Sequence, residues 1–353
     1  MPDPFGSFSW IFVTDPIDID ITPYPNIAGS HTVLPQCNLL FSQIWNADPP
    51  SLTNLFPDSS EFFTNYNVTG ESAREDPVVQ VARSDAGVGV GSNCEMARVG
   101  HRGSPGDIAL IVLSALSFLL AISLSIHASK RKAAVGRIEL RFFLFLYGVH
   151  SALQIITMSS LLEQGSTALS ILRSIHVALI ASLFWVLLGN AIIATQLVED
   201  GTAAAIAPLS ILAILFFIPT LYISLDTSLG WTNVFEISGE DLTYLKNIAL
   251  FILTLLWPAI AVVIYTILML YITLNTLRET KPALLYLGAC ILFAVGQVIF
   301  FLVSQPLCDA SNGKVNSSFL STLLEAGSVG LIYLAWKSIT EDDWGEDVYG
   351  AYY

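Results

Sequence analysis

The chain has 353 residues, of which 54% are hydrophobic and only 12% are charged. Soluble domains carry about 25% charged residues, so this composition over such a length indicates a protein whose solvent is largely lipid. The formal net charge of −14 arises mainly from acids in the N-terminal segment, the 226–241 loop and the C-terminal tail. No basic stripe with interleaved aromatic residues is present, so nucleic-acid binding has no support.

Residues 1–106 are rich in Pro, Asn, Ser, Asp and Gly and show neither helical nor strand periodicity for any length. They predict a loop-rich segment and not an enzyme domain. The first residues lack a basic n-region, so no secretory signal peptide is expected. If this segment crosses the membrane, the first membrane span must carry it.

Seven stretches then satisfy the requirement of about 20 apolar residues for a membrane-crossing helix. In chain order they are 107–128, 139–162, 167–197, 203–225, 244–275, 283–305 and 318–337. Pro208, Pro219 and Pro258 fall inside the fourth and fifth stretches and predict kinks. The sequence therefore predicts an all-α membrane protein: a seven-transmembrane helix bundle over 107–337, followed by an acidic tail, 338–353.

The distribution of basic residues predicts the orientation of this bundle. One side would carry Lys130, Arg131, Lys132, Arg137, Arg278, Lys281 and Lys337, and the other Arg173, Lys246 and Lys314. The excess on the first side places the C-terminal tail in the cytoplasm and the N-terminal segment in the lumen or outside the cell. Two N-glycosylation sequons, at Asn67 and Asn316, fall on the predicted lumenal side.

Three of the four cysteines, Cys37, Cys94 and Cys308, fall on that same oxidising side, where disulfides persist. A bridge from Cys94 to Cys308 would join the start of the first span to the loop before the seventh. The alternative is that all three thiols stay free. Cys290 lies within the sixth span and is expected simply to pack there.

Polar side chains at membrane depth are costly to bury and are therefore functional candidates. They are Gln154, Asn190, Gln196, Gln297 and Glu325. For the uncharged amides we favour interhelical hydrogen bonds, worth about 0.6–2 kcal/mol each, over a transport pathway. For Glu325 the basic group nearest in the expected arrangement is Arg173, and we predict that they pair.

A catalytic zinc needs three protein ligands that converge. His150 and His176 can meet across one pair of helices, but no third ligand lies near them, which favours hydrogen-bonded histidines. No nucleophile–base pair can be assembled either. We therefore expect no catalytic residue, no metal, no cofactor and no enzymatic activity.

Four short segments at the ends of the predicted spans remain distinctive. Ala134-Val135-Gly136-Arg137 opens the second span, and Glu199-Asp200-Gly201-Thr202 forms a turn after the third, in which Thr202 is expected to cap the next helix. Gly296-Gln297-Val298 and then Cys308-Asp309 accompany the sixth span. Trp336-Lys337-Ser338-Ile339-Thr340 and the acids Glu341 to Asp343 end the seventh.

In order and spacing these segments resemble the fungal chitin synthase export chaperone family, polytopic proteins of the endoplasmic reticulum membrane, and the chain is identified as a divergent member. The resemblance implies a non-enzymatic escort that assists the folding and export of chitin synthase, and so supports cell wall chitin synthesis. Expected partners are chitin synthase, the lipid bilayer and the export machinery, with residence in the endoplasmic reticulum or onward travel to the plasma membrane. The residues that would carry this role are Gly136, Arg137, Glu199, Asp200, Gly201, Thr202, Gly296, Gln297, Trp336, Thr340 and Asp342. A seven-transmembrane receptor and a lipid or small-solute transporter are the alternatives that the same topology allows.

Overall fold

The computed structural model describes residues 39, 108–131, 135–159, 161–162, 166–232, 234–235, 247–302, 307, 310–311, 315 and 317–340. Leu39 apart, the predicted N-terminal segment lies outside the described residues, and so does the tail beyond Thr340. Asn67, Cys94 and Asp342 fall in those two parts, and Cys308 and Asn316 fall in gaps between residues 302 and 317. The sequons, the proposed Cys94–Cys308 bridge and the role of Asp342 therefore stay predictions.

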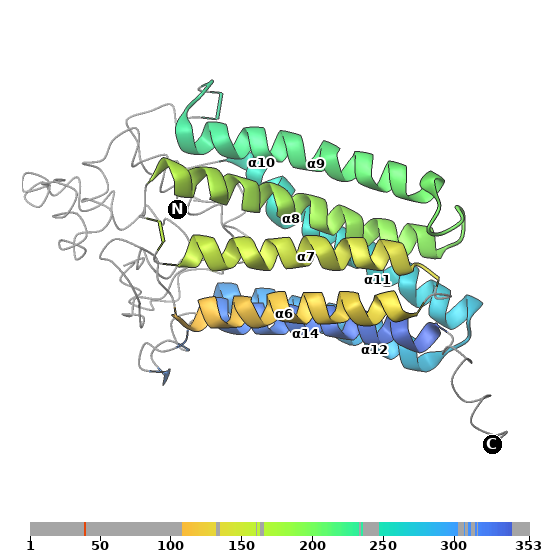
Figure 1. Cartoon of the computed structure of the whole chain (residues 1–353). Helices are drawn as coiled ribbons and strands as arrows, with labels where there is room; N and C mark the ends of the chain where they lie inside the picture. The colour runs from red at the N-terminus through yellow and green to blue at the C-terminus, as the bar shows by residue number, and fades with distance from the viewer. Residues whose placement is uncertain are drawn as a thin grey trace, which may run out of the picture.

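Long helices dominate the described residues, among which there is no strand (Figure 1). They are α6 (Ile108–Lys130), α7 (Arg137–Met158), α8 (Thr167–Ala194), α9 (Ala203–Leu229), α10 (Ile248–Phe251), α11 (Trp257–Tyr271), α12 (Thr280–Leu302) and α14 (Ser317–Ile339). Together with two π-helical segments they make seven helices that are long and apolar enough to cross a membrane. The predicted seven-helix membrane architecture is therefore confirmed.

The fifth span is one continuous stretch, Ile248–Thr276, in which α10 and α11 are joined by the π-helical segment Ile252–Leu256. Pro258 lies two residues after this segment, as the second residue of α11, and a widened turn accommodates a residue that has no backbone N–H to donate. The other two prolines do not break their helix, because α9 runs through both Pro208 and Pro219.

The helices pack mainly as antiparallel neighbours, α6 with α7, α8 with α9 and α12 with α14. In Figure 1 α9, α8, α7 and α6 follow one another across the bundle, and α11 crosses behind α8. α8 lies at the centre, because 72% of its membrane-length window is buried, against 22% for α9 and 28% each for α6 and α12.

Small residues and side-chain hydrogen bonds hold these helices close. A Cβ at Gly189 on α8 would clash with Leu209 Cδ1 on α9, so glycine lets the two helices approach with the Leu209 side chain in its present position. Beside it the Trp185 indole N–H donates to the Leu209 carbonyl over 3.1 Å. Ser182 Oγ donates to the Ala213 carbonyl at 2.8 Å. Without a hydrophobic driving force between helices in lipid, such close contacts supply the association energy.

Candidate functional site

Two loops meet at the end of the bundle where α14 ends, which we call the motif end. Gly136 precedes α7 and adopts φ +68°, a left-handed conformation that favours glycine. Its N–H donates to Asp200 Oδ2 at 2.7 Å, across from the loop between α8 and α9. A backbone group at the start of one span is therefore held by an acid at the start of another.

A second hydrogen bond runs in the opposite direction between the same loops. Gly201 also has φ +68°, and its N–H donates to Glu139 Oε1 at 2.7 Å. Glu139 lies in the first turn of α7 and is completely buried. We call this reciprocal pair of acid-to-glycine bonds the loop clasp. Hydrogen bonds with a carboxylate acceptor are about twice as strong as neutral ones, so the clasp fixes the relative positions of the two loops.

The end of α14 is fastened to the same loops. The Trp336 indole N–H donates to the Val135 carbonyl at 2.8 Å. From the end of α6, Arg131 Nη1 donates to Thr340 Oγ1 at 3.1 Å and to the Lys337 carbonyl at 3.3 Å. The motif end therefore joins the ends of α6, α8 and α14 to the beginnings of α7 and α9.

The structure thus brings together five of the predicted site residues, namely Gly136, Asp200, Gly201, Trp336 and Thr340. Arg137 begins α7 beside them, and the Glu199 side chain points to solvent. The capping prediction for Thr202 was half right. It occupies the N-cap position of α9, but its hydroxyl donates backwards to the Glu199 carbonyl at 2.7 Å and makes no cap bond with the helix.

Glu139 is the member of this site that sequence reasoning missed. Its backbone carbonyl also accepts from the Asn190 side chain of α8 at 3.2 Å, so Asn190 does bridge helices as predicted. The available signal was a carboxylate within an apolar, membrane-length stretch, which by itself marks a constrained position. Gln196 was placed wrongly within a span, because α8 ends at Ala194 and Gln196 is exposed in the turn after it, at φ 59°.

The remaining two predicted residues described by the structure, Gly296 and Gln297, lie elsewhere, on α12 against α14. A Cβ at Gly296 would lie 3.4 Å from Leu324 Cβ, so this glycine permits close helix packing. Gln297 Nε2 donates to Glu325 Oε1 at 2.9 Å. The prediction that Glu325 pairs with Arg173 was therefore wrong: its hydrogen-bond partner is an amide on the neighbouring helix.

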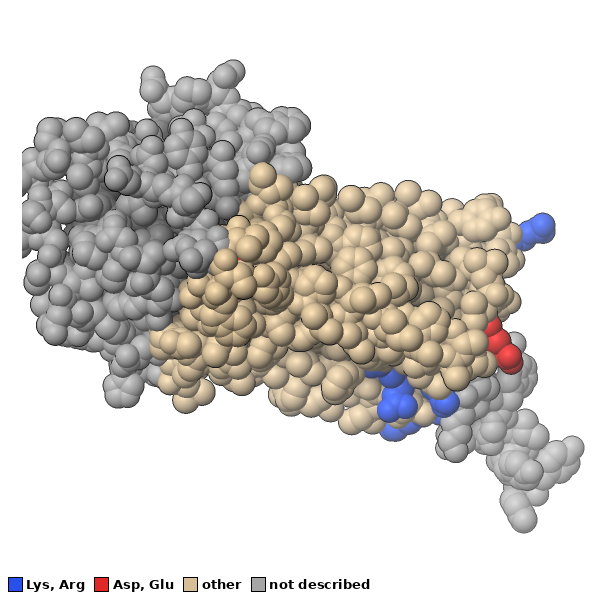
Figure 2. Space-filling view, turned by 90° about the horizontal axis from the view of Figure 1, so that it is seen from above, with Lys and Arg blue, Asp and Glu red and all other residues tan. Residues whose placement is uncertain are grey.

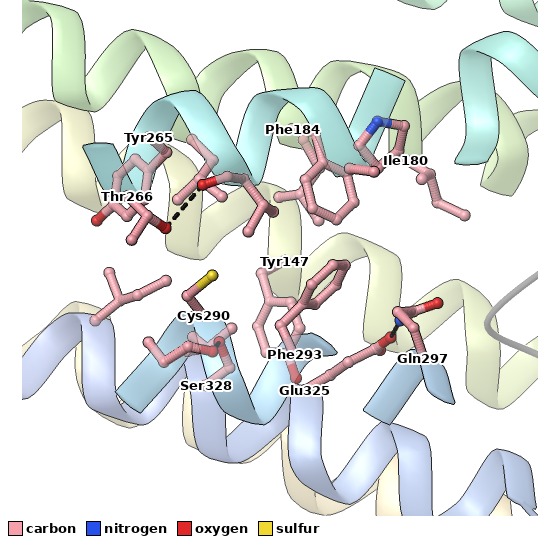
Figure 3. Close-up of a pocket in the computed structure, with 18 of the residues that line it drawn as sticks. Tyr147, Ile180, Phe184, Tyr265, Thr266, Cys290, Phe293, Gln297, Glu325 and Ser328 are labelled. Atoms are coloured by element: carbon pink, nitrogen blue, oxygen red, sulfur yellow. Dashed lines mark hydrogen bonds between the residues drawn. The ribbon is translucent and has the colours of Figure 1, made fainter. Parts of the chain in front are cut away.

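The Gln297–Glu325 pair faces a cavity of about 370 Å³ inside the bundle. α7, α8, α11, α12 and α14 all contribute to its wall, which is largely apolar and aromatic. Figure 3 shows Gln297 and Glu325 at one end of the cavity and Tyr265 and Thr266 at the other. Such a space is not predictable from sequence, because it depends on how five helices pack.

The two central histidines do meet, as predicted. His150 Nδ1 on α7 and His176 Nε2 on α8 lie 2.8 Å apart, which is a hydrogen-bond distance. Among the described residues no group of three or more His, Cys, Asp or Glu side chains is placed to hold a metal ion. The pair therefore links α7 to α8.

The flanks of the bundle are apolar, and its charged groups gather near the motif end. Figure 2 shows a tan flank, with blue and red side chains toward the end where α14 finishes. The basic residues at this end are Lys130, Arg131, Arg137, Arg141, Arg278, Lys281 and Lys337. Among the described Lys and Arg residues only Arg173 lies outside this group, buried on α8.

Comparison with known proteins adds to this geometry. A family model described as chitin synthase export chaperone matches residues 27–349. A chitin synthase export chaperone of Gibberella zeae is 26% identical over 235 residues, covering 67% of this chain and 68% of the relative. One from Coccidioides immitis is 26% identical over 237 residues, with 67% and 68% covered. One from Chaetomium globosum is 24% identical over 273 residues, with 76% and 77% covered. No solved structure matches.

Proposed function

Because the chain belongs to the chitin synthase export chaperone family, we propose that it helps a chitin synthase to fold and to leave the endoplasmic reticulum. The observation that carries this proposal is the family match over residues 27–349, which includes all seven membrane-length helices and the whole motif end. The role requires contact with a client and no chemical step, so we propose a non-enzymatic escort.

The apolar flanks of the bundle support contact with a membrane-embedded client. α6, α9 and α12 are the least buried spans. They expose large apolar side chains such as Leu116, Ile214 and Ile291. In a bilayer these faces contact either lipid or the spans of another membrane protein. α9 is the most available, because 22% of its window is buried and it packs mainly on α8.

The motif end supports contact with a cytosolic or client segment. The clasp residues use their polar groups internally, whereas the same two loops expose apolar side chains. Leu197 and Val198, between α8 and α9, have exposed fractions of 81% and 39%, and Val135, before α7, has 45%. Exposed apolar groups beside a rigid, hydrogen-bonded scaffold are a typical interaction surface. We propose that Asp200, Gly201 and Trp336 position this surface and that the exposed residues make the contacts.

The basic residues at the motif end support an orientation in which this end faces the cytoplasm. The N-terminal segment and the sequons at Asn67 and Asn316 would then be lumenal. Endoglycosidase treatment tests this: each of Asn67→Gln and Asn316→Gln should remove one glycan-dependent mobility shift. An epitope after Tyr353 should stay accessible to protease in sealed microsomes. Protection of that epitope would invert the proposed topology.

Deletion of the gene in its fungal host tests the function itself. Chitin synthase should then accumulate in the endoplasmic reticulum, with reduced delivery to the cell surface, and the intact gene should restore delivery. An unrelated polytopic plasma membrane protein serves as the control and should travel normally. Unchanged delivery of every chitin synthase would refute the proposal. The comparisons do not favour the receptor and transporter alternatives.

A further inference from the structure

We propose that the cavity between α7, α8, α11, α12 and α14 binds one neutral membrane lipid that carries a hydroxyl group. Its apolar body would lie among the aromatic side chains, and its hydroxyl would donate to the Glu325 carboxylate. This site is separate from the motif end and goes beyond the proposed escort function, which neither requires nor implies it.

The dimensions of the cavity suit a lipid. Its volume of about 370 Å³ falls in the range of about 300–1,000 Å³ found for small-molecule sites. It extends along α12 from Tyr286 to Val298. The twelve residue steps between them correspond to about 18 Å at 1.5 Å per residue. The space is therefore long and narrow, as one sterol or one acyl chain requires.

The chemistry of the wall selects the polar group of the ligand. Glu325 Oε1 accepts from Gln297, while no described residue donates to Oε2. The Glu325 side chain lines the cavity and is half-buried, so the free oxygen is accessible from the space. Whether it is ionised or protonated, the Glu325 carboxyl keeps an oxygen that accepts, so a ligand hydroxyl can donate to it in either state. A hydroxyl is the smallest neutral group that does so.

The wall also excludes phospholipids with their headgroup inside. Lys and Arg are absent from the residues that line the cavity. A phosphate would bring a negative charge into an apolar space with no Lys or Arg to balance it, which is strongly unfavourable. Sterols and acylglycerols share the required chemistry, namely an apolar body with a neutral hydroxyl.

A route from the bilayer is present on the flank. Ala259 on α11 and Val298 on α12 both line the cavity and both are exposed, Val298 by 53%. The cavity therefore reaches the surface between these two helices. In a membrane that surface faces lipid, so a lipid molecule can enter laterally without crossing water.

Photolabelling of the purified full-length protein in mild detergent tests the site. Clickable, photoreactive forms of a sterol and of a diacylglycerol are the probes, and labelled peptides are mapped by mass spectrometry. At least one probe should label α11, α12 or α14 near the cavity, and the better probe identifies the source of the hydroxyl. The unlabelled parent lipid should compete about tenfold better than its O-methyl ether, which cannot donate.

Three substitutions make the test specific. Ala259→Phe should block the opening and abolish labelling, whereas Ala294→Phe, on an α12 residue that is also exposed but does not line the cavity, should leave it unchanged. Glu325→Leu should make the parent lipid and its ether equal competitors, and Glu325→Gln, which keeps an acceptor oxygen, should preserve their difference. Gel filtration confirms that each variant is folded. Labelling that survives Ala259→Phe, an ether that competes equally in the unmodified protein, or no labelling by either probe would overturn the proposal.

Discussion

Replacing Asp200 with alanine removes the acceptor of the Gly136 N–H and opens one half of the loop clasp. A hydrogen bond to a charged group contributes about 1.5–3 kcal/mol. Asp200 and Gly136 are only half-buried, so water can replace part of the lost bond. We therefore expect the free energy of unfolding to fall by about 1.5 kcal/mol, at the lower limit of that range.

Removing the acceptor in the other half of the clasp, Glu139, should lower the free energy of unfolding by more. Glu139 is fully buried, and its Oε1 accepts from Gly201 at 2.7 Å. Glu139→Ala leaves that N–H without its acceptor and also removes side-chain volume, so we expect a loss of about 3 kcal/mol. Because both bonds join the same two loops, breaking one loosens the other. The double variant should cost less than the sum of the two single variants by at least about 0.5 kcal/mol.

Unfolding by sodium dodecyl sulfate in mixed micelles, followed by circular dichroism, measures these differences. Glu199→Ala is the matched control, because it removes the same charge from the same loop but only an exposed side chain. The free energy of unfolding of Glu199→Ala should stay within about 0.5 kcal/mol of that of the unmodified protein. If Asp200→Ala costs no more than Glu199→Ala, the clasp does not hold the loops and the reasoning fails.

Three further changes test the packing described above by the same unfolding assay. Gly201→Ala should destabilise by about 1–2 kcal/mol, because alanine is strained at positive φ. Gly189→Ala should destabilise the α8–α9 contact by about 1–3 kcal/mol through overpacking, and Leu209→Ala in the same chain should recover part of that loss by removing the clashing methyl groups. Trp336→Phe keeps an aromatic side chain but removes the N–H that donates to the Val135 carbonyl, together with part of a buried ring system, so we expect a loss of at least about 1 kcal/mol. An unchanged stability would show that the bond contributes nothing.

The spans of this protein were predictable because the bilayer constrains sequence so strongly. A membrane helix must satisfy its backbone internally and present apolar side chains over about 30 Å, and both requirements are visible in composition alone. The predicted stretch 107–128 became Ile108–Lys130, and 318–337 became Ser317–Ile339. The ends were less certain because they depend on capping and turn geometry. The stretch predicted to reach 162, for example, ends at Met158.

The polar contacts were only partly predictable, because they depend on which helix faces which. Asn190 was expected to bond between helices and does so. Glu325 was assigned to Arg173 by charge, whereas α12 lies beside α14 and supplies Gln297 at 2.9 Å. Opposite charge was therefore a weaker guide than adjacency. The role of Glu139 could not be predicted for the same reason, because its partner, Gly201, lies 62 residues further along the chain, in the loop between α8 and α9.

The loop clasp distinguishes two reasons why a residue can belong to a sequence motif: it can be needed for the fold, or it can contact a partner. Gly136 and Gly201 belong to short segments that resemble the family, yet each uses its N–H on an acid of the same chain. Their identities follow from positive φ, and their N–H groups are used within the chain, so a partner does not have to touch them. The exposed residues beside them, Leu197 above all, are free of such constraints and are available to a partner. A substitution in the clasp should therefore impair both stability and export, whereas Leu197→Ser should impair export with stability unchanged. If Leu197→Ser has no effect on chitin synthase delivery while Asp200→Ala does, the motif end supports the fold and does not itself bind the partner.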